Sequence, residues 1–395
     1  MTANEFYASL SGKRITFVGV GRSNLPLIEQ FKAHGAAVSV RDKRSEAALG
    51  EDGEALKKLG AKLICGEDYL ESIDEDMLFR APGVPYLLPE LQKARANGVA
   101  VTSEMEVFFD LCPCKIYAVT GSDGKTTTTS VIAEMLKAAG KTVHLGGNIG
   151  RPLLPEIRDV KPEDVAVVEL SSFQLISMRR SPNVAVITNL SPNHLDVHKD
   201  MDEYIAAKEN IYLHQHEGDI AIFNEDNDIT RSLSEKVSAR MRLFSRREEV
   251  ADGAFLRGDT IVLRHDGCEE AVMQISDIRL PGMHNVENYL AAVTALDGLV
   301  PYEVMRETAR TFVGVEHRIE PVRTIHGVQW YNDSIASSPS RTIAGLNSFP
   351  EQVILIAGGK DKGISYAPLG PVVNDHVKLL LLCGKTAGVI REAVE

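Results

Sequence analysis

Short apolar runs alternate with amphipathic stretches along the whole chain. The first run, at residues 14–21, ends in glycines and precedes a helical pattern over 25–34 and a second apolar run at 37–40. Strand, helix and strand in this order predict a βαβ unit. Further strands are expected at residues 62–65, 77–80 and 99–102.

The same alternation restarts at residue 115. An apolar run over 115–120 leads into a helical pattern at about 126–139, and strands are expected at 142–145, 165–169 and 184–189. Strands separated by helices predict a parallel sheet covered by helices. Residues 239–278 instead show short alternating segments between glycine turns, which indicate a small antiparallel patch. A helix at about 285–299 closes this block.

A third block begins near residue 315, with strands expected at 328–332, 353–357 and 377–383. The pattern predicts an α/β protein of three domains, at residues 1–102, 103–314 and 315–395. The first and third domains read as Rossmann-like. The last helical pattern stops at Glu395 in what reads as an unfinished sheet, so we expect the third domain to be incomplete.

Composition and charge restrict the class of protein. The chain of 395 residues is 44% hydrophobic and 25% charged, as folded globular proteins are. A net charge of −12 argues against nucleic acid as a partner, because anions must be held by local groups. Five scattered cysteines, no secretory signal and no apolar run of membrane-spanning length predict a cytoplasmic protein without a membrane anchor, and we expect a monomer.

The clearest chemical signal is a glycine-rich loop between an expected strand and an expected helix. It has the shorter Gly-x-x-Gly-Lys-Thr form of a phosphate-binding loop, in which backbone amides converge on phosphate oxygens. Lys125 supplies a fixed charge, and the Thr126 hydroxyl is a ligand for Mg²⁺. We expect the loop to bind ATP through Gly121, Ser122, Asp123, Gly124, Lys125, Thr126 and Thr127. The central domain is therefore predicted to be a P-loop-type ATPase.

A second glycine turn, Gly19-Val20-Gly21, is followed by Asp42 about twenty residues on. This spacing is close to the dinucleotide fingerprint, in which a helix N-terminus holds a pyrophosphate and the acid holds a ribose. Asn24 replaces the third glycine. The turn is thus either a pyrophosphate site or a plain connection between strand and helix.

Three further polar residues are candidates on weaker grounds. Glu169 ends an expected strand near the phosphate loop, where a carboxylate can hold Mg²⁺ or cap a helix. His194 lies in a loop, where a histidine either binds a metal or substrate or is solvated. Lys208, by composition alone, reads as a solvated helix lysine.

In this order, the motifs resemble the Mur ligases, the ATP-dependent amino-acid ligases of peptidoglycan precursor synthesis. The resemblance covers the whole chain and rests on the phosphate loop, Gly146-Gly147-Asn148-Ile149-Gly150, Glu169-Leu170-Ser171-Ser172-Phe173-Gln174, Ala207-Lys208, residues 281–288 and His317-Arg318-Ile319-Glu320. Within the family, residues 19–23 and 331–334 resemble the members that add D-glutamate to UDP-N-acetylmuramoyl-L-alanine. The motifs of the L-alanine-adding and of the diaminopimelate- or lysine-adding members are not present.

The resemblance implies a role for each matched residue. Lys125, His194, Lys208 and Arg318 are the catalytic set, and two Mg²⁺ ions are held by Thr126 with Glu169 and by His194 with a carbamylated Lys208. Carbamylation turns an ammonium into an oxygen ligand of the kind that Mg²⁺ prefers. The nucleotide is further held by Asn285, Asn288, Arg318 and Asp333; the UDP substrate by Gly21, Arg22, Ser23, Asp42, Arg44, Asn148 and Ser171; and the acceptor by Ser337 and Lys362.

The reaction implied is phosphorylation of the substrate carboxylate by ATP and attack on the acyl phosphate by the amine of D-glutamate. Two departures stand out: Ile335 replaces a lysine of many relatives, and the chain stops before the family's serine and aromatic clasp for D-glutamate. We therefore expect the chain to bind ATP and the UDP substrate but to turn over poorly. The alternatives are another amide ligase of the family, such as the L-alanine-adding enzyme or folylpolyglutamate synthetase, a nicotinamide-dependent oxidoreductase, and a non-catalytic nucleotide-binding protein.

Overall fold

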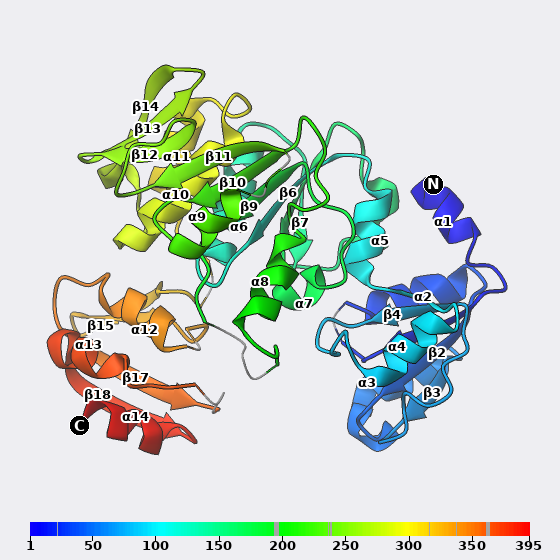
Figure 1. Cartoon of the computed structure of the whole chain (residues 1–395). Helices are drawn as coiled ribbons and strands as arrows, with labels where there is room; N and C mark the ends of the chain where they lie inside the picture. The colour runs from blue at the N-terminus through cyan, green and yellow to red at the C-terminus, as the bar shows by residue number, and fades with distance from the viewer. Residues whose placement is uncertain are drawn as a thin grey trace.

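A computed structural model of the chain describes residues 1–21, 23–192, 197–235, 237, 239–315, 317–336, 338–360 and 364–395. Its strands form a five-stranded sheet, a nine-stranded sheet and two separate pairs, in that order along the chain. The five-stranded sheet and the C-terminal pairs flank the same end of the central part (Figure 1). Within the described ranges, no helix has the length and apolar character needed to cross a membrane.

The N-terminal sheet is wholly parallel, with strand order β3-β2-β1-β4-β5. Its strands are β1 (Arg14–Val18), β2 (Ala37–Asp42), β3 (Lys62–Cys65), β4 (Met77–Arg80) and β5 (Ala100–Thr102). Helices α1 (Ala3–Ala8), α2 (Leu25–Ala33), α3 (Gly50–Lys58) and α4 (Pro89–Ala96) accompany them. The strand order reverses beside β1, so the glycine turn that follows β1 lies at a topological switch point, where α/β sheets bind ligands.

The central sheet has nine strands in the order β14-β13-β12-β11-β10-β9-β6-β8-β7. They are β6 (Lys115–Thr120), β7 (Val143–Gly147), β8 (Val165–Glu169), β9 (Val184–Ile187), β10 (Ile220–Asn224), β11 (Arg240–Ser245), β12 (Gly253–Arg257), β13 (Thr260–His265) and β14 (Cys268–Gln274). All pairings from β7 to β12 are parallel, and the pairings of β12 with β13 and of β13 with β14 are antiparallel. The antiparallel patch expected at residues 239–278 is therefore restricted to residues 253–274, where it extends the main sheet, whereas β11 pairs in parallel.

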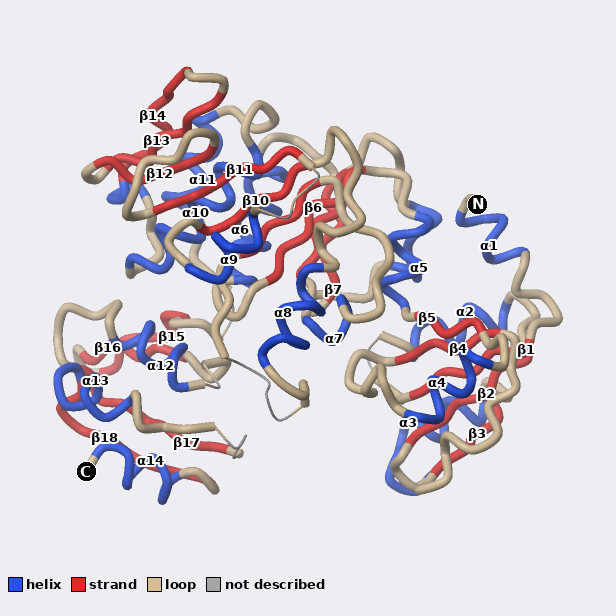
Figure 2. Tube along the Cα trace, in the orientation of Figure 1, coloured by secondary structure: helices blue, strands red, loops and turns tan. Residues whose placement is uncertain are grey.

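Helices cover both faces of the central sheet (Figure 2). They are α5 (Glu104–Leu111), α6 (Lys125–Ala138), α7 (Ser172–Leu175), α8 (Met201–Glu209), α9 (Asp228–Ser234), α10 (Met283–Leu296) and α11 (Tyr302–Thr311). Alternate residues of β6 point to opposite faces: Tyr117 and Val119 join the cluster with α6 and α10, whereas Ile116 and Ala118 join the cluster with α5 and α8. Apolar residues on both faces explain why this strand reads as a continuous apolar run.

The C-terminal part contains an antiparallel hairpin and a parallel pair. The hairpin joins β15 (Glu320–Ile325) to β16 (Val328–Asn332), and the pair joins β17 (Val353–Gly359) to β18 (Val377–Gly384). The accompanying helices are α12 (Pro339–Leu346), α13 (Leu369–His376) and α14 (Ala387–Val394). Leu346, Leu369 and Val373 form a small core of their own.

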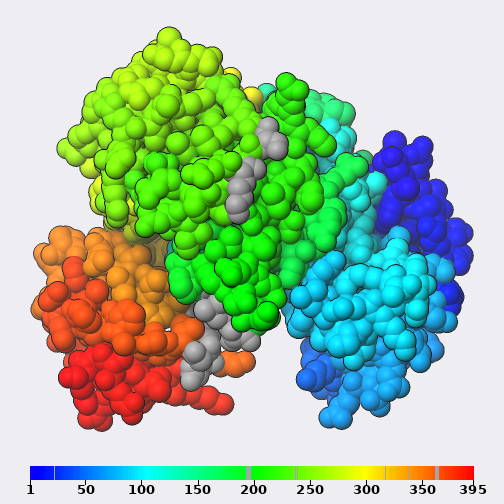
Figure 3. Space-filling view, viewed as in Figure 1, coloured from blue at the N-terminus to red at the C-terminus, as the bar shows by residue number. Residues whose placement is uncertain are grey.

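The N-terminal sheet is firmly joined to the central part. Tyr7 donates to Gln30 Oε1 at 2.6 Å and to the Leu154 carbonyl at 3.2 Å, and Gln30 donates to the Pro155 carbonyl at 2.9 Å. The apolar cluster of the N-terminal sheet continues into that of the central sheet. The C-terminal part has a separate core, and the space-filling view shows it as a distinct lobe (Figure 3).

Candidate active site

The phosphate loop connects β6 to α6, and its two glycines have conformations that other residues avoid. Gly121 has φ 150° and Gly124 has φ 78°. A Cβ at Gly121 would collide with the Thr188 hydroxyl, and one at Gly124 with Asn288 Oδ1. The loop is thus packed so closely against its neighbours that only glycine fits at either position.

Asn189 holds the loop in place. Its carbonyl accepts from the Ser122 N–H at 2.8 Å, and its Oδ1 accepts from the Asp123 N–H at 2.9 Å. The loop then runs directly into α6, whose first N–H groups have no carbonyl partner within the helix. These N–H groups and the helix dipole favour an anion at this position, where the sequence predicts phosphate binding.

Two lysines lie beneath the loop. Lys125 Nζ donates to the Gly121 and Ser122 carbonyls at 3.0 Å each, and Lys208 Nζ donates to the Gly121 carbonyl at 2.9 Å and to Thr120 Oγ1 at 3.0 Å. Burial lowers the pKa of Lys125 to about 8. Burial, and then the charge of Lys125, lower the pKa of Lys208 well below its usual value. Lys208 is only 2% exposed, so it is no solvated helix lysine.

Glu169 ends β8 beside these lysines and has one unpaired oxygen. Oε1 accepts from Asn148 Nδ2 at 2.7 Å, whereas Oε2 is buried without a hydrogen-bond partner. Buried carboxylate oxygens are normally paired, so an unpaired one near a phosphate loop fits a cation. Ser171, also predicted at this end of the site, caps α7 and donates to Gln174 Oε1 at 2.8 Å.

The predicted nucleotide residues come together around the same loop. Asn288 accepts from the Thr128 hydroxyl at 3.1 Å and donates to Asn285 Oδ1 at 3.1 Å, and both asparagines are buried on α10. Arg318 is largely buried, and its Nε has no partner. Burial lowers the pKa of Arg318 and raises that of Asp333, and each charge opposes the effect on the other.

A separate cavity of about 300 Å³ lies at the switch point of the N-terminal sheet. It is lined by Gly19, Val20, Gly21, Ser23, Ala81, Pro82, Gly83 and Val84. Both carboxylate oxygens of Asp42 are hydrogen-bonded within the protein. Oδ2 accepts from the Val20 N–H at 2.8 Å, and Oδ1 accepts from Arg44 Nε at 2.9 Å. These hydrogen bonds lower the pKa of Asp42 despite burial, which opposes them.

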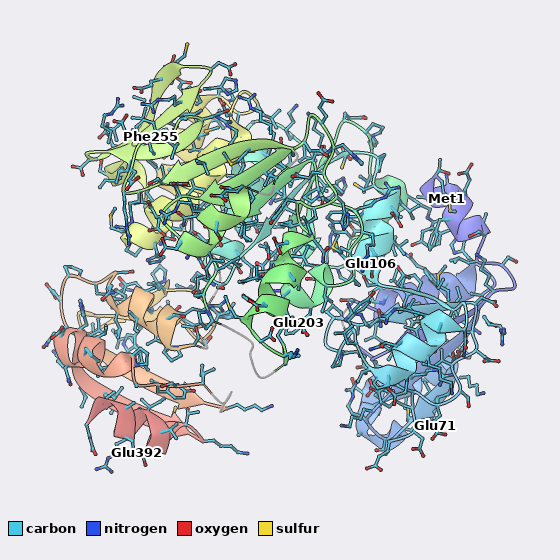
Figure 4. The ribbon with its side chains drawn as sticks, in the orientation of Figure 1. Met1, Glu71, Glu106, Glu203, Phe255 and Glu392 are labelled. Atoms are coloured by element: carbon cyan, nitrogen blue, oxygen red, sulfur yellow. The ribbon has the colours of Figure 1, made fainter. Side chains whose placement is uncertain are left out.

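Sequence reasoning did not find Arg80, which connects the cavity to the central site. This buried arginine donates to the Val84 carbonyl, at the rim of the cavity, and to the Phe173 carbonyl, in the segment that follows Glu169, at 2.8 Å each. Its only signal in the sequence is an arginine at the end of a buried strand. His198 was also not assigned. It lies between Ser172 Oγ and Glu203 Oε1, at 2.9 Å from each, and Glu203 is labelled in Figure 4.

Four predicted site residues, Arg22, His194, Ser337 and Lys362, fall outside the described residues. Within the described ranges, no three His, Cys, Asp or Glu side chains converge as a metal site. The other predicted Mg²⁺ ligands, Thr126, Glu169 and Lys208, all belong to the phosphate-loop region. Of these, the unpaired Glu169 oxygen is the group that fits a metal ion.

A phosphate loop at the carboxyl edge of a parallel sheet, between two further α/β parts, defines a nucleoside-triphosphate-binding enzyme. Residues 119–296 match the Mur ligase middle domain. The UDP-N-acetylmuramoylalanine–D-glutamate ligase of Acetivibrio thermocellus is 51% identical over 99% of this chain and 84% of its own length. That of Clostridium novyi is 49% identical over 100% of this chain and 85% of its own length. The chain therefore belongs to the Mur ligase family, in the group of the UDP-N-acetylmuramoylalanine–D-glutamate ligases.

Solved structures agree on the fold. MurF from Acinetobacter baumannii is 18% identical, with a TM-score of 0.61 over 99% of this chain and 87% of its own. The UDP-N-acetylmuramate–alanine ligase MurC from Thermotoga maritima is 20% identical, with a TM-score of 0.60 over 97% and 88%. The three-part α/β architecture predicted from the sequence is confirmed. The protein is an ATP-dependent ligase that joins a carboxylate to an amine, and not a nicotinamide-dependent oxidoreductase.

Proposed function

We propose that the protein adds D-glutamate to UDP-N-acetylmuramoyl-L-alanine in peptidoglycan precursor synthesis, with release of ADP and phosphate. The observation that carries this proposal is the identity of 51% and 49%, over nearly the whole chain, to two ligases of that name. The phosphate loop, Glu169 and the two buried lysines support it, because they place phosphate-binding and metal-binding groups together.

The chemistry explains why ATP is needed. A free carboxylate is a poor acyl donor, and transfer of the terminal phosphoryl group to a carboxylate oxygen creates a leaving group. The amine of D-glutamate then attacks the carbonyl carbon, the tetrahedral intermediate expels phosphate, and the ammonium proton is lost. The protein's part is to position the reactants and to offset negative charge. The N-terminus of α6, Lys125 and Arg318 do this in our proposal.

We infer two Mg²⁺ ions, one held by Thr126 and Glu169 and the other by His194 and carbamylated Lys208. When bound, Mg²⁺ supplies positive charge that stabilises the transferring phosphoryl group. Two observations support the inference: the Glu169 oxygen without a partner, and the lowered pKa of Lys208. A neutral amine is the form that reacts with CO₂ to give a carbamate.

We assign the UDP moiety to the cavity of the N-terminal sheet, whose wall includes Gly21 and Ser23. The family resemblance adds Asp42, Arg44 and Arg22 to this site, of which Arg22 lies outside the described residues. Asn148 and Ser171 then face the muramoyl-alanine end, and Ser337 and Lys362 contact the acceptor. This assignment makes residues 1–102 the UDP-substrate domain, 103–314 the ATP domain and 315–395 the acceptor domain. We infer a cytoplasmic monomer.

The test is phosphate release by the purified protein with ATP, Mg²⁺, UDP-N-acetylmuramoyl-L-alanine and a panel of amino acids. The proposal expects release that depends on D-glutamate, with an amide product of matching mass. Release that depends on L-alanine or L-glutamate instead would assign the chain to another amide ligase of the family.

A further inference from the structure

A single ion pair connects the C-terminal part to the phosphate loop. Arg341 on α12 places its Nε 3.1 Å from Asp123 Oδ1, although the two residues are far apart in sequence. Within the described ranges, no other ion pair joins the C-terminal part to the rest of the chain. The side chains are 22% and 31% exposed, so the pair lies at the mouth of the loop and not in its interior.

The loop's partner in this pair is a carboxylate on a fixed backbone. The Asp123 N–H donates to Asn189 Oδ1, and its carbonyl accepts from Asn189 Nδ2 at 3.2 Å. The Asp123 side chain takes no part in these contacts. It is therefore free to exchange one cationic partner for another without moving the loop.

Arg341 also lies close to the other charges of the site. Its positive charge lowers the pKa of both Lys125 and Arg318, although burial is the larger cause in each case. Three cations that repel one another in this way are best accommodated by a polyanion. The triphosphate of ATP, held on the N-terminus of α6, supplies one where Asp123 supplies a single charge.

The loop before α12 brings no cation of its own at residue 335. Ile335 is apolar, and its carbonyl accepts from Arg341 Nη1 at 3.4 Å. The side chain of residue 335 therefore contributes no positive charge here, whereas that of Arg341 does.

We propose that Arg341 is a phosphate-binding residue of the ligase, delivered to the nucleotide by the C-terminal part. Asp123 holds the guanidinium when the loop is empty. With ATP bound, the guanidinium donates to oxygens of the terminal phosphate, and docking of the C-terminal part is thereby coupled to the presence of a triphosphate. This proposal rests on ATP binding at the phosphate loop, and it does not depend on which amino acid is the acceptor.

Binding titrations on the full chain test it, with a non-hydrolysable ATP analogue and with ADP, both with Mg²⁺. Arg341→Ala is expected to weaken the ATP analogue about tenfold or more, as for loss of a charged hydrogen bond, and ADP much less. Arg341→Lys keeps the charge but not the forked pair of donors. Its affinity for the ATP analogue is expected to lie between those of the wild type and Arg341→Ala. The matched control is Arg391→Ala, whose exposed guanidinium pairs with Glu395, and both nucleotides should bind it as they bind the wild type.

Two outcomes overturn the proposal. Equal losses of affinity for the ATP analogue and for ADP in Arg341→Ala would make Arg341 a tether between the two parts. Equal losses of affinity in Asp123→Asn would lead to the same conclusion. Unchanged binding of both nucleotides would remove Arg341 from the site. Failure of the wild-type chain to bind the ATP analogue would instead contradict ATP binding itself, so the two failures are distinguishable.

Discussion

Lys125 and Lys208 both donate from Nζ to one atom, the carbonyl oxygen of Gly121, at 3.0 and 2.9 Å. Keeping both ammonium groups charged at this separation and burial costs free energy. Burial lowers the pKa of each lysine, and the charge of Lys125 lowers that of Lys208, the more deeply buried, still further. The arrangement therefore favours the charge on Lys125 and disfavours it on Lys208.

The first prediction concerns Lys208. Lys208→Ala should lower ligase turnover about 100-fold or more, because a group that stabilises the transferring phosphoryl is lost. Lys208→Arg should be equally impaired, since a guanidinium keeps a cation but cannot carry a carbamate. Wild-type turnover should fall in CO₂-depleted buffer and return with bicarbonate. Near-normal turnover in Lys208→Arg would show that a cation, and not a carbamate, is what position 208 supplies.

The second prediction concerns pH and Lys125. Because its pKa is about 8, Lys125 in the free protein loses its proton as the pH rises through 8. A bound phosphate keeps Lys125 protonated. ATP affinity should thus be constant below pH 7 and fall by about tenfold per pH unit above 8. Calorimetry across this range measures it. Lys125→Arg keeps its charge, so its affinity should not change with pH there; an unchanged affinity of the wild type up to pH 9.5 would refute the prediction.

Buried parallel strands are the part of the fold that the sequence predicts best. The strands at 77–80, 115–120 and 165–169 have the expected bounds, because apolar residues on both faces make continuous runs. β15 (Glu320–Ile325) was not expected. Most of its residues are exposed, so its sequence carries no apolar pattern that distinguishes a strand from a loop.

The residues of the site likewise divide into those that could be predicted from the sequence and those that could not. The phosphate loop could be predicted, because its chemistry depends on neighbouring residues with fixed spacing. Arg80 and Arg341 could not, because each acts across a contact between distant segments and belongs to no local motif. The burial of Lys208 was equally invisible in its helix, whose composition suggests a solvated side chain; only the family resemblance gave it a role.

A third prediction tests the unpaired oxygen of Glu169. Glu169→Gln replaces one carboxylate oxygen by an amide nitrogen and should raise the Mg²⁺ concentration for half-maximal turnover by at least about tenfold. Asn148→Ala removes the donor to Oε1 but leaves the carboxylate, so its effect should be smaller. The measurement is a Mg²⁺ titration at saturating ATP. If Glu169→Gln lowers turnover with an unchanged Mg²⁺ requirement, Glu169 does not hold the metal.

The fourth prediction concerns Glu104, a carboxyl group that the reaction does not use. Glu104 Oε1 accepts from the N–H groups of Leu153 and Leu154 at 2.8 Å each, in the segment that packs against α1 and α2. Burial raises its pKa to about 7, from 4.5, and the two hydrogen bonds oppose this only in part. The folded protein therefore holds a proton that the unfolded chain has lost between these two pH values.

The direction of the pH effect on stability follows from this difference in bound protons. The contribution of Glu104 to stability is fully present below pH 4.5 and is lost as the pH rises to about 7, a loss of about 3 kcal/mol in the free energy of unfolding. Glu104→Gln still accepts the two N–H groups and never ionises. It should match the wild type near pH 5 and be more stable at pH 8, which urea unfolding at the two pH values measures. Glu71→Gln, at the surface of the N-terminal part (Figure 4), is the control and should follow the wild type at both. Equal stability of Glu104→Gln and wild type at pH 8 would mean that the Glu104 carboxylate is accommodated without cost. In that case, the stability of the junction between the N-terminal sheet and the central part would not depend on pH through Glu104.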